Sequence, residues 1–204
     1  MRNYLVLVLL VCVFSTPLFG QSRQRIYQLQ DALANNSITL TANGNGSSSG
    51  MSVDGTIKNN TGAEILINVI LDNGLYFKNS GVGQNMIATQ IFLGDNTCVY
   101  NGTFYYISIP PNREAAVTFL AFCADFERSN PSSSEQFSSA ALPDNLKGIA
   151  AKISKYMENT IFEDEITAVQ LALWHYQGVN RSSIAEQFVF DDSDWELAAS
   201  IINN

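Results

Sequence analysis

The sequence predicts an α+β fold in which an N-terminal β-sandwich or barrel is followed by a small helical subdomain. Between residues 51 and 123, short alternating apolar and polar runs are separated by turn-forming residues, which is typical of a sandwich or barrel. From residue 143 onward, apolar residues recur every three or four positions, as on the buried face of a helix. We therefore expect a single secreted domain over residues 21–204, mainly β over 21–125 and mainly helical over 126–204.

The first twenty residues have the features of a cleavable secretory signal. Arg2 supplies positive charge, residues 4–14 are apolar, and turn-forming and small residues lead to Gly20. A helix needs about 20 apolar residues to span a bilayer, so this run is short for a membrane anchor, which is the alternative interpretation. We expect residues 1–20 to be removed, and the mature protein to be secreted or held at the cell surface.

A short helix is expected over residues 23–34, because Ile26, Leu29 and Leu33 recur at helical spacing. A short β-like run follows over residues 38–41. The stretch 43–50 is rich in Gly and Ser, so we expect it to be a flexible loop or wide turn.

Alternation of apolar and polar residues then predicts the strands of the sandwich or barrel. The turn-forming sequence at 72–74 divides two of them, and Pro110-Pro111 ends another. The runs expected to be strands are 53–57, 64–71, 75–77, 86–93, 103–109 and 115–123.

Three helices are expected in the C-terminal part. Residues 144–157 carry a helical apolar stripe, and a second helix is expected over 163–177, with acidic residues at its start and Gly178 after its end. A last helix runs to Ile202, with Ser193 or Asp194 as its N-cap.

The charge and composition narrow the classes of partner. The formal net charge is −8, which disfavours nucleic acid and anionic lipid as partners. No second long apolar stretch follows the signal, so no membrane span is expected in the mature chain. A protein or surface ligand is the expected partner, and self-assembly is a further possibility.

Familiar enzyme signatures are lacking in the sequence. Its one histidine, His175, lies between Trp174 and Tyr176 and is interpreted as a packing residue. No Cys/His cluster has metal-ligand spacing, and neither a phosphate-binding loop nor a G-x-S-x-G motif occurs. We expect no catalytic site, no metal site and no cofactor.

Two cysteines, Cys98 and Cys123, remain after the signal. In an oxidising compartment two cysteines commonly form one disulfide. A Cys98–Cys123 disulfide is therefore one expectation, and two free thiols are another.

Two short segments are more specific. One is Phe122-Cys123-Ala124-Asp125, and the other runs from Val169 to Trp174 with the sequence VQLALW. Over about residues 117–178 the chain resembles bacterial thioester domains, which pair an aromatic-Cys-x-Asp strand end with a helix bearing Thr-Gln-x-Ala. The preceding segment Gln84-Asn85-Met86 has a looser resemblance to a region found with such modules.

The resemblance implies a specific chemistry. The thiol of Cys123 and the side chain of Gln170 would condense, with loss of ammonia, into an internal thioester that an amine on a target can attack. Asp125, Ala172 and Trp174 complete the matching motifs, and Phe122 precedes the cysteine. A thioester must be sheltered from water, which apolar neighbours can do. The implied function is covalent attachment of a secreted or surface adhesion module.

A second interpretation stays open. A glutamine on an apolar helix stripe can be a buried amide that bonds backbone groups, and a cysteine at a strand end can be a core residue. The chain would then be a noncovalent structural or interaction module, such as a coat, a filament subunit or a binding sandwich.

Overall fold

The computed structural model describes residues 26–95, 97–158 and 165–204, which form a mixed α+β fold dominated by strands. The expected signal peptide over residues 1–20 lies outside the described residues. The first residues of two expected helices, 23–25 and 163–164, lie outside them as well.

Six strands form a closed barrel in the order β10-β2-β3-β9-β6-β5, and all neighbours in it pair antiparallel. Of the two architectures that the sequence allows, the structure therefore has the barrel. Its strands are β2 (Ile38–Gly44), β3 (Ser49–Asn59), β5 (Ile70–Asn79), β6 (Met86–Leu93), β9 (Glu114–Cys123) and β10 (Gln136–Ala140).

A separate four-stranded sheet has the order β1-β4-β8-β7. Only β1 and β4 in it pair parallel. Its strands are β1 (Ile26–Tyr27), β4 (Ile65–Asn68), β7 (Val99–Tyr100) and β8 (Tyr105–Ile109).

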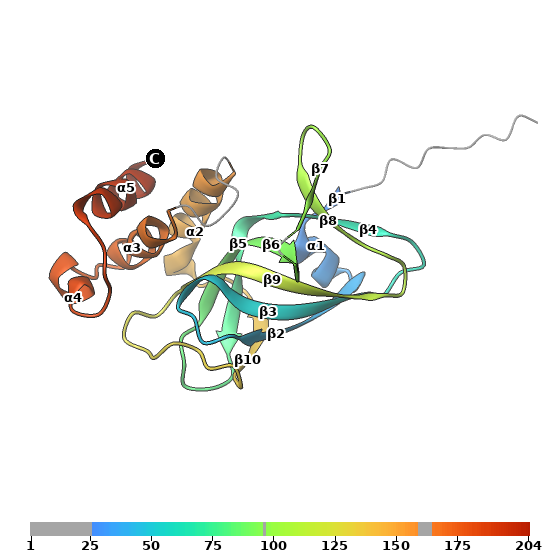
Figure 1. Ribbon diagram of the computed structural model, residues 1–204, viewed down its shortest axis with the longest axis horizontal. Coiled ribbons are helices and arrows are strands. Elements are labelled where there is room, and N and C mark those ends of the chain that lie inside the picture. The colour runs from blue at the N-terminus through green and yellow to red at the C-terminus, as the bar shows by residue number, and fades with distance from the viewer. Residues whose placement is uncertain (1–25, 96, 159–164) are drawn as a thin grey trace, which may run out of the picture.

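Five helices are described. Figure 1 shows that all but the first gather on one side of the barrel, whereas β4, β7 and β8 lie toward the other side. They are α1 (Leu29–Ala34), α2 (Asp144–Met157), α3 (Ile166–Tyr176), α4 (Arg181–Ala185) and α5 (Asp192–Asn203).

Aromatic side chains from three strands meet in the core of the barrel. The Phe77 ring is 5.0 Å from the Phe119 ring in an edge-to-face arrangement and 5.7 Å from the Phe137 ring. Phe77 and Phe119 are fully buried, and Phe137 is 8% exposed. Because burial of aromatic area is a large stabilising term, this contact ties β10 to β5 and β9.

Several elements near the N-terminus differ from the expectation. Ile26 and Tyr27 form strand β1, so within the described part of the expected helix over 23–34 only Leu29–Ala34 is helical. Strands β2 and β3 extend into the Gly- and Ser-rich stretch and leave residues 45–48 as their connection. Cross-strand backbone hydrogen bonds outweigh the weak strand preference of these residues.

The expected turn at 72–74 is instead an irregularity inside β5. The pairing of β5 with β6 shifts between Ile70 and Leu75, and Asn73 and Gly74 both have positive φ, 59° and 71°. Asn and Gly tolerate this conformation, so the turn signal marks a bulge that bends one strand.

In the C-terminal part, the structure adds two elements that the sequence pattern did not predict, β10 and α4. The N-cap of α5 is Asp191 and not Ser193 or Asp194. The Asp191 side chain accepts from the backbone N–H of Asp194, and the Asp194 carboxylate accepts from the N–H of Asp191, which makes a capping box.

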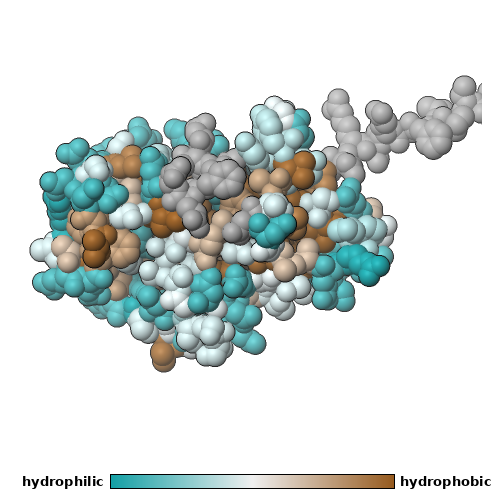
Figure 2. Space-filling model, viewed as in Figure 1, coloured by the Kyte–Doolittle hydropathy of each residue, from teal (hydrophilic) through white to brown (hydrophobic). Residues whose placement is uncertain are grey.

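The surface carries a cluster of exposed apolar groups in the β7–β8 hairpin. Val99, Tyr100 and Phe104 are 47%, 55% and 51% exposed, and the Tyr100 and Tyr105 rings are 4.6 Å apart. On the face shown in Figure 2, hydrophobic residues are interspersed with hydrophilic ones. An exposed aromatic hairpin of this kind is a feature of binding surfaces.

The closing role of β10 can be tested by stability. Phe137→Ala should lower the free energy of unfolding by about 3 kcal/mol, because it removes a buried ring from the barrel core. Ser138→Ala, at the next and exposed position of the same strand, should change it by less than about 0.5 kcal/mol. Urea denaturation measures both, and equal small effects would contradict the closure of the barrel by β10.

Candidate functional site

Cys123 and Gln170 lie in direct contact, although 47 positions separate them in the chain. Cys123 is the last residue of β9, and Gln170 lies in the first half of α3. The backbone N–H of Cys123 donates to Oε1 of Gln170 at 2.9 Å, and Nε2 of Gln170 donates to the carbonyl oxygen of Cys123 at 2.9 Å. The carboxamide thus pairs with both polar backbone groups of one residue.

Both members of the pair are fully buried. Every α3 residue from Ala168 to Trp174, Ala172 included, is buried as well, so the carboxamide is enclosed among apolar side chains. A buried amide is costly unless its donor and acceptor are both bonded. The two hydrogen bonds meet that requirement and hold the Gln170 carboxamide against the backbone of Cys123.

The Cys123 thiol is held in its neutral form. Burial raises its pKa well above the ordinary value, and the negative charge of Asp125 raises the pKa further. Its Sγ lies 3.6 Å from Sδ of Met86, the residue opposite Cys123 in the pairing of β6 with β9. Since the thiolate is the reactive form, a free thiol here is protected from external reagents near neutral pH.

Asp125 fastens the chain just beyond Cys123 to the segment before β6. Its Oδ2 accepts hydrogen bonds from the backbone N–H of Asn85 at 3.0 Å and from Nδ2 of Asn85 at 2.6 Å. The carbonyl of Asn85 in turn accepts from the N–H of Ala124 at 2.8 Å. Arg128 lies 3.7 Å from the same carboxylate. Asp125 therefore fixes the direction in which the chain leaves β9.

Three aromatic residues, Phe126, Trp174 and Phe188, pack together close in the chain to the pair, since Phe126 follows Cys123 by three residues and Trp174 follows Gln170 by four. We call them the aromatic cover. The Trp174 ring is 5.1 Å from the Phe126 ring and 5.4 Å from the Phe188 ring, both edge to face. Trp174 is 4% exposed, and its Nε1 has no hydrogen-bond partner among the described residues.

Three further residues that the sequence analysis singled out make no hydrogen bond or ring contact with the Cys123–Gln170 pair in the described part of the chain. Phe122 is fully buried in β9 and pairs with Ile87 of β6. Cys98 is half-buried just before β7, in the other sheet, and both Cys98 and Cys123 are free thiols in the structure. His175 is exposed on α3, with its ring 4.7 Å from the Trp195 ring.

The structure adds residues that the motifs did not identify. Asn85 is in the segment noted from the looser resemblance, but its bonds to Asp125 were not predicted. Phe126 and Phe188 carry no sequence signal, because their contacts with Trp174 depend on how the loop after β9 and the chain after α4 fold back.

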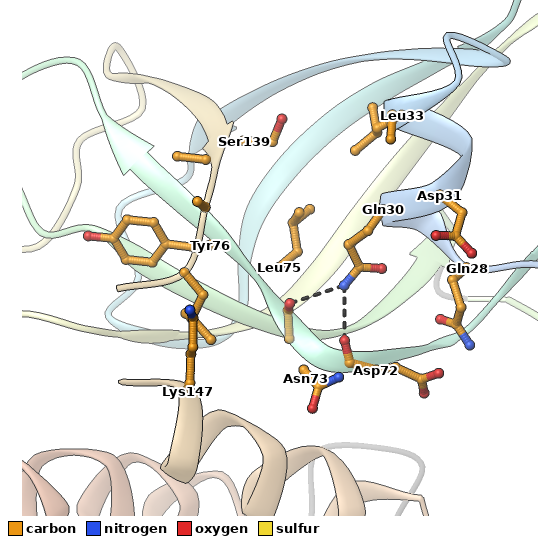
Figure 3. Close-up of a pocket in the computed structure, with 15 residues that line it drawn as sticks. Gln28, Gln30, Asp31, Leu33, Asp72, Asn73, Leu75, Tyr76, Ser139 and Lys147 are labelled. Carbon is orange, nitrogen blue, oxygen red and sulfur yellow. Dashed lines mark hydrogen bonds between the residues drawn. The ribbon is translucent and has the colours of Figure 1, made fainter. Parts of the chain in front are cut away.

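A separate groove of about 920 Å³ lies between α1, β5, β10 and α2. Figure 3 shows Leu33, Leu75, Tyr76 and Lys147 around it, and Nε2 of Gln30 bridging the carbonyls of Asp72 and Gly74 at 3.1 and 3.0 Å. None of the residues that the motifs identify lines this groove.

Within the described ranges, no group of three or more His, Cys, Asp or Glu side chains is arranged to hold a metal ion. In the same part of the chain, none of the helices has both the length and the apolar character that crossing a membrane requires.

Comparison with known proteins leaves the site to be interpreted from its own geometry. No protein-family model, curated protein or solved structure matches the chain.

The pairing of Gln170 with Cys123 should contribute measurably to stability. In a Cys123→Ala background, where no crosslink can form, Gln170→Ala should lower the free energy of unfolding by about 2–4 kcal/mol, through lost hydrogen bonds and a cavity. Gln177→Ala, on the exposed end of the same helix, is the control and should cost less than about 1 kcal/mol. Urea denaturation measures both, and equal effects would contradict the pairing.

Burial of the thiol also predicts a pH dependence. In protein whose Cys123 is free, the folded state keeps the thiol proton at pH values where the unfolded state, with a pKa of about 8.5, loses it. The free energy of unfolding should therefore fall above that pH, by up to about 1.4 kcal/mol per pH unit, relative to Cys123→Ala. Denaturation curves between pH 7 and 10 measure this difference. Parallel pH profiles of the two proteins would show that the thiol is not buried.

Proposed function

We propose that this chain is a secreted or cell-surface binding module that attaches covalently to amine groups of a target through a Cys123–Gln170 thioester. The observation that carries the proposal is the pair of reciprocal hydrogen bonds between the Gln170 carboxamide and the Cys123 backbone. Two segments resembling the motifs of thioester domains thus meet in one buried contact. The signal-like N-terminus supports an extracellular location.

Formation of the thioester needs no further reactant. The Cys123 sulfur attacks Cδ of Gln170, a C–S bond forms, and the bond between Cδ and Nε2 breaks. The thiol proton leaves with the nitrogen as ammonia. Because burial keeps the resting thiol neutral, its proton must pass to the departing nitrogen as the sulfur adds.

The two hydrogen bonds of the Gln170 carboxamide assist thioester formation, one at the carbonyl oxygen and one at the leaving nitrogen. As sulfur adds to the carbonyl, negative charge develops on Oε1. The Cys123 N–H, which is shared with the carbonyl of Ser48 at 3.1 Å, already donates to Oε1 at 2.9 Å. A preorganised donor at the site of developing charge lowers the barrier of acyl transfer. The second hydrogen bond, from Nε2 to the Cys123 carbonyl, orients the leaving nitrogen.

Capture of a target follows by the same chemistry. A primary amine attacks the thioester carbon, a C–N bond forms, the C–S bond breaks, and the proton of the amine passes to sulfur. The product is an amide between the target and Gln170, with a free thiol at Cys123. Burial protects the thioester from water until a nucleophile enters, and the surrounding α3 residues provide that burial.

A second candidate is a noncovalent interaction module. The fully bonded Gln170 amide also suits a purely structural role, and both the exposed aromatic hairpin and the groove of Figure 3 are surfaces that such a module can use. In this candidate Cys123 stays a buried thiol.

Mass measurement separates the two candidates. The mature protein should lack the mass of one ammonia, with the loss mapped by peptide analysis to a Cys123–Gln170 crosslink, and methylamine should open that crosslink and release one thiol. Cys123→Ala and Gln170→Ala should both restore the full mass, whereas Cys98→Ala and Gln177→Ala should not. An unmodified mass with both thiols free, or a Cys98–Cys123 disulfide, would exclude the covalent function and favour the noncovalent one.

A further inference from the structure

We propose that Phe126 is the gate of the thioester, and that it admits slender primary amines while excluding bulky nucleophiles and slowing water. This inference rests on the proposed function, because it concerns which nucleophiles reach the Cys123–Gln170 bond. It assigns a specificity-determining role to a residue that lies outside both motifs.

The position of Phe126 follows from two parallel contacts between the same two segments. Phe126 lies three residues after Cys123, and Trp174 lies one helical turn after Gln170, on the same face of α3. The rings of Phe126 and Trp174 touch at 5.1 Å and 76°. The aromatic contact therefore lies next to the Cys123–Gln170 contact, on the side toward the end of α3.

The members of the aromatic cover differ in how firmly they are held. Trp174 is 4% exposed, belongs to a helix, and is packed by Phe188 from a second direction. Phe126 is partly exposed and lies in a turn. Asp125 is anchored by Asn85, so a movement of Phe126 need not disturb the end of β9. Phe188 is also partly exposed and lies outside the helices, but Phe126 is the member that follows Cys123 closely in the chain, so we assign the gate to Phe126.

The indole of Trp174 lowers the cost of that movement. Its Nε1–H is buried and has no partner among the described residues, and an unpaired buried donor is unfavourable by about 1–3 kcal/mol. Any movement of the aromatic cover that exposes this N–H lets solvent or an incoming polar group accept from it. The closed aromatic cover is therefore stabilised by ring packing, but it leaves one buried donor unpaired within the described part of the chain, and opening relieves that unfavourable term.

Selection among nucleophiles follows from the narrow opening. Displacement of one ring leaves a passage beside Trp174, which is itself fixed by Phe188. An unbranched alkylamine, such as a lysine side chain, fits such a passage, and aromatic faces attract its cationic form at the entrance. A branched or cyclic amine must displace further packed side chains, which lowers the rate at which it reacts with the thioester.

The test compares amines of different width on the full mature chain. Rates of reaction with methylamine and with cyclohexylamine are followed by intact mass and thiol release, for the wild type, Phe126→Ala and Phe126→Leu. Phe126→Ala should raise the cyclohexylamine rate at least about 10-fold relative to methylamine and should speed hydrolysis, and Phe126→Leu should lie between. The second variant keeps the test valid if the first folds poorly.

A matched control lies on the opposite side of Gln170. Ile166 is four residues before Gln170 on the same helix and is also only partly buried, so Ile166→Ala should leave the rate ratio within about 3-fold of the wild type. If the thioester forms but both Phe126 variants keep the wild-type rate ratio, the gate is wrong and the proposed function stands. The same conclusion follows if Ile166→Ala changes the ratio as much as the Phe126 variants do. A wild-type protein that forms no thioester overturns the proposed function itself.

Discussion

The arrangement of this molecule depends on the pairing of one side-chain carboxamide with the backbone of one strand residue. Gln170 bonds both the N–H and the carbonyl of Cys123, and in doing so joins helix α3 to the last residue of the central barrel strand β9. The two groups are fully buried, so neither can exchange these bonds for water without opening the interface. The pairing thus fixes the register of the helix against the barrel with a precision that apolar packing alone does not give.

Burial of the pair requires its polar groups to be hydrogen-bonded, and it also changes the reactivity of the Cys123 thiol. It raises the pKa of the Cys123 thiol, so an uncombined thiol there is inert toward outside reagents. In the same enclosure, the Gln170 carboxamide is hydrogen-bonded to the Cys123 backbone, so the two residues are held in contact away from water. This burial suits the proposed internal acyl bond, and it equally suits a pair that is only a structural contact.

Sequence patterns predicted well the elements that depend on local periodicity, and poorly those that depend on pairing with strands distant in the chain. The strand over 86–93 and the helix over 144–157 have the predicted bounds, because their alternation and helical stripe are uninterrupted. Strand β10 was missed, since a short, mostly polar run becomes a strand only when β5 and β2 offer it partners. The turn signal at 72–74 was real but belongs to a bulge inside β5. Propensity indicates which backbone conformation is allowed there, not which strands flank it.

The same distinction applies to the candidate site. Cys123 and Gln170 could be singled out because their motifs are local, and their adjacency was implied only by the resemblance that connects the two motifs. Asn85 and Phe126 could not be singled out from the pattern. Asn85 lies before β6 and bonds Asp125, whereas Phe126 lies in a turn after β9 and packs against Trp174 of α3. These contacts exist only in the folded chain.

The position of the site follows from how the barrel is closed. After β9 the chain must cross to the opposite side of the barrel to supply β10 between β2 and β5, so the segment between Cys123 and Gln136 is a connection and not part of the barrel wall. That connection passes the helices as it leaves Cys123, and its first residues meet Asn85 and Trp174. The proposed pair therefore lies at the end of a barrel strand, bordered by a connecting loop on one side and a helix on the other. Under the proposal, β9 and α3 supply the fixed geometry, and the loop that closure of the barrel makes necessary supplies the border that opens.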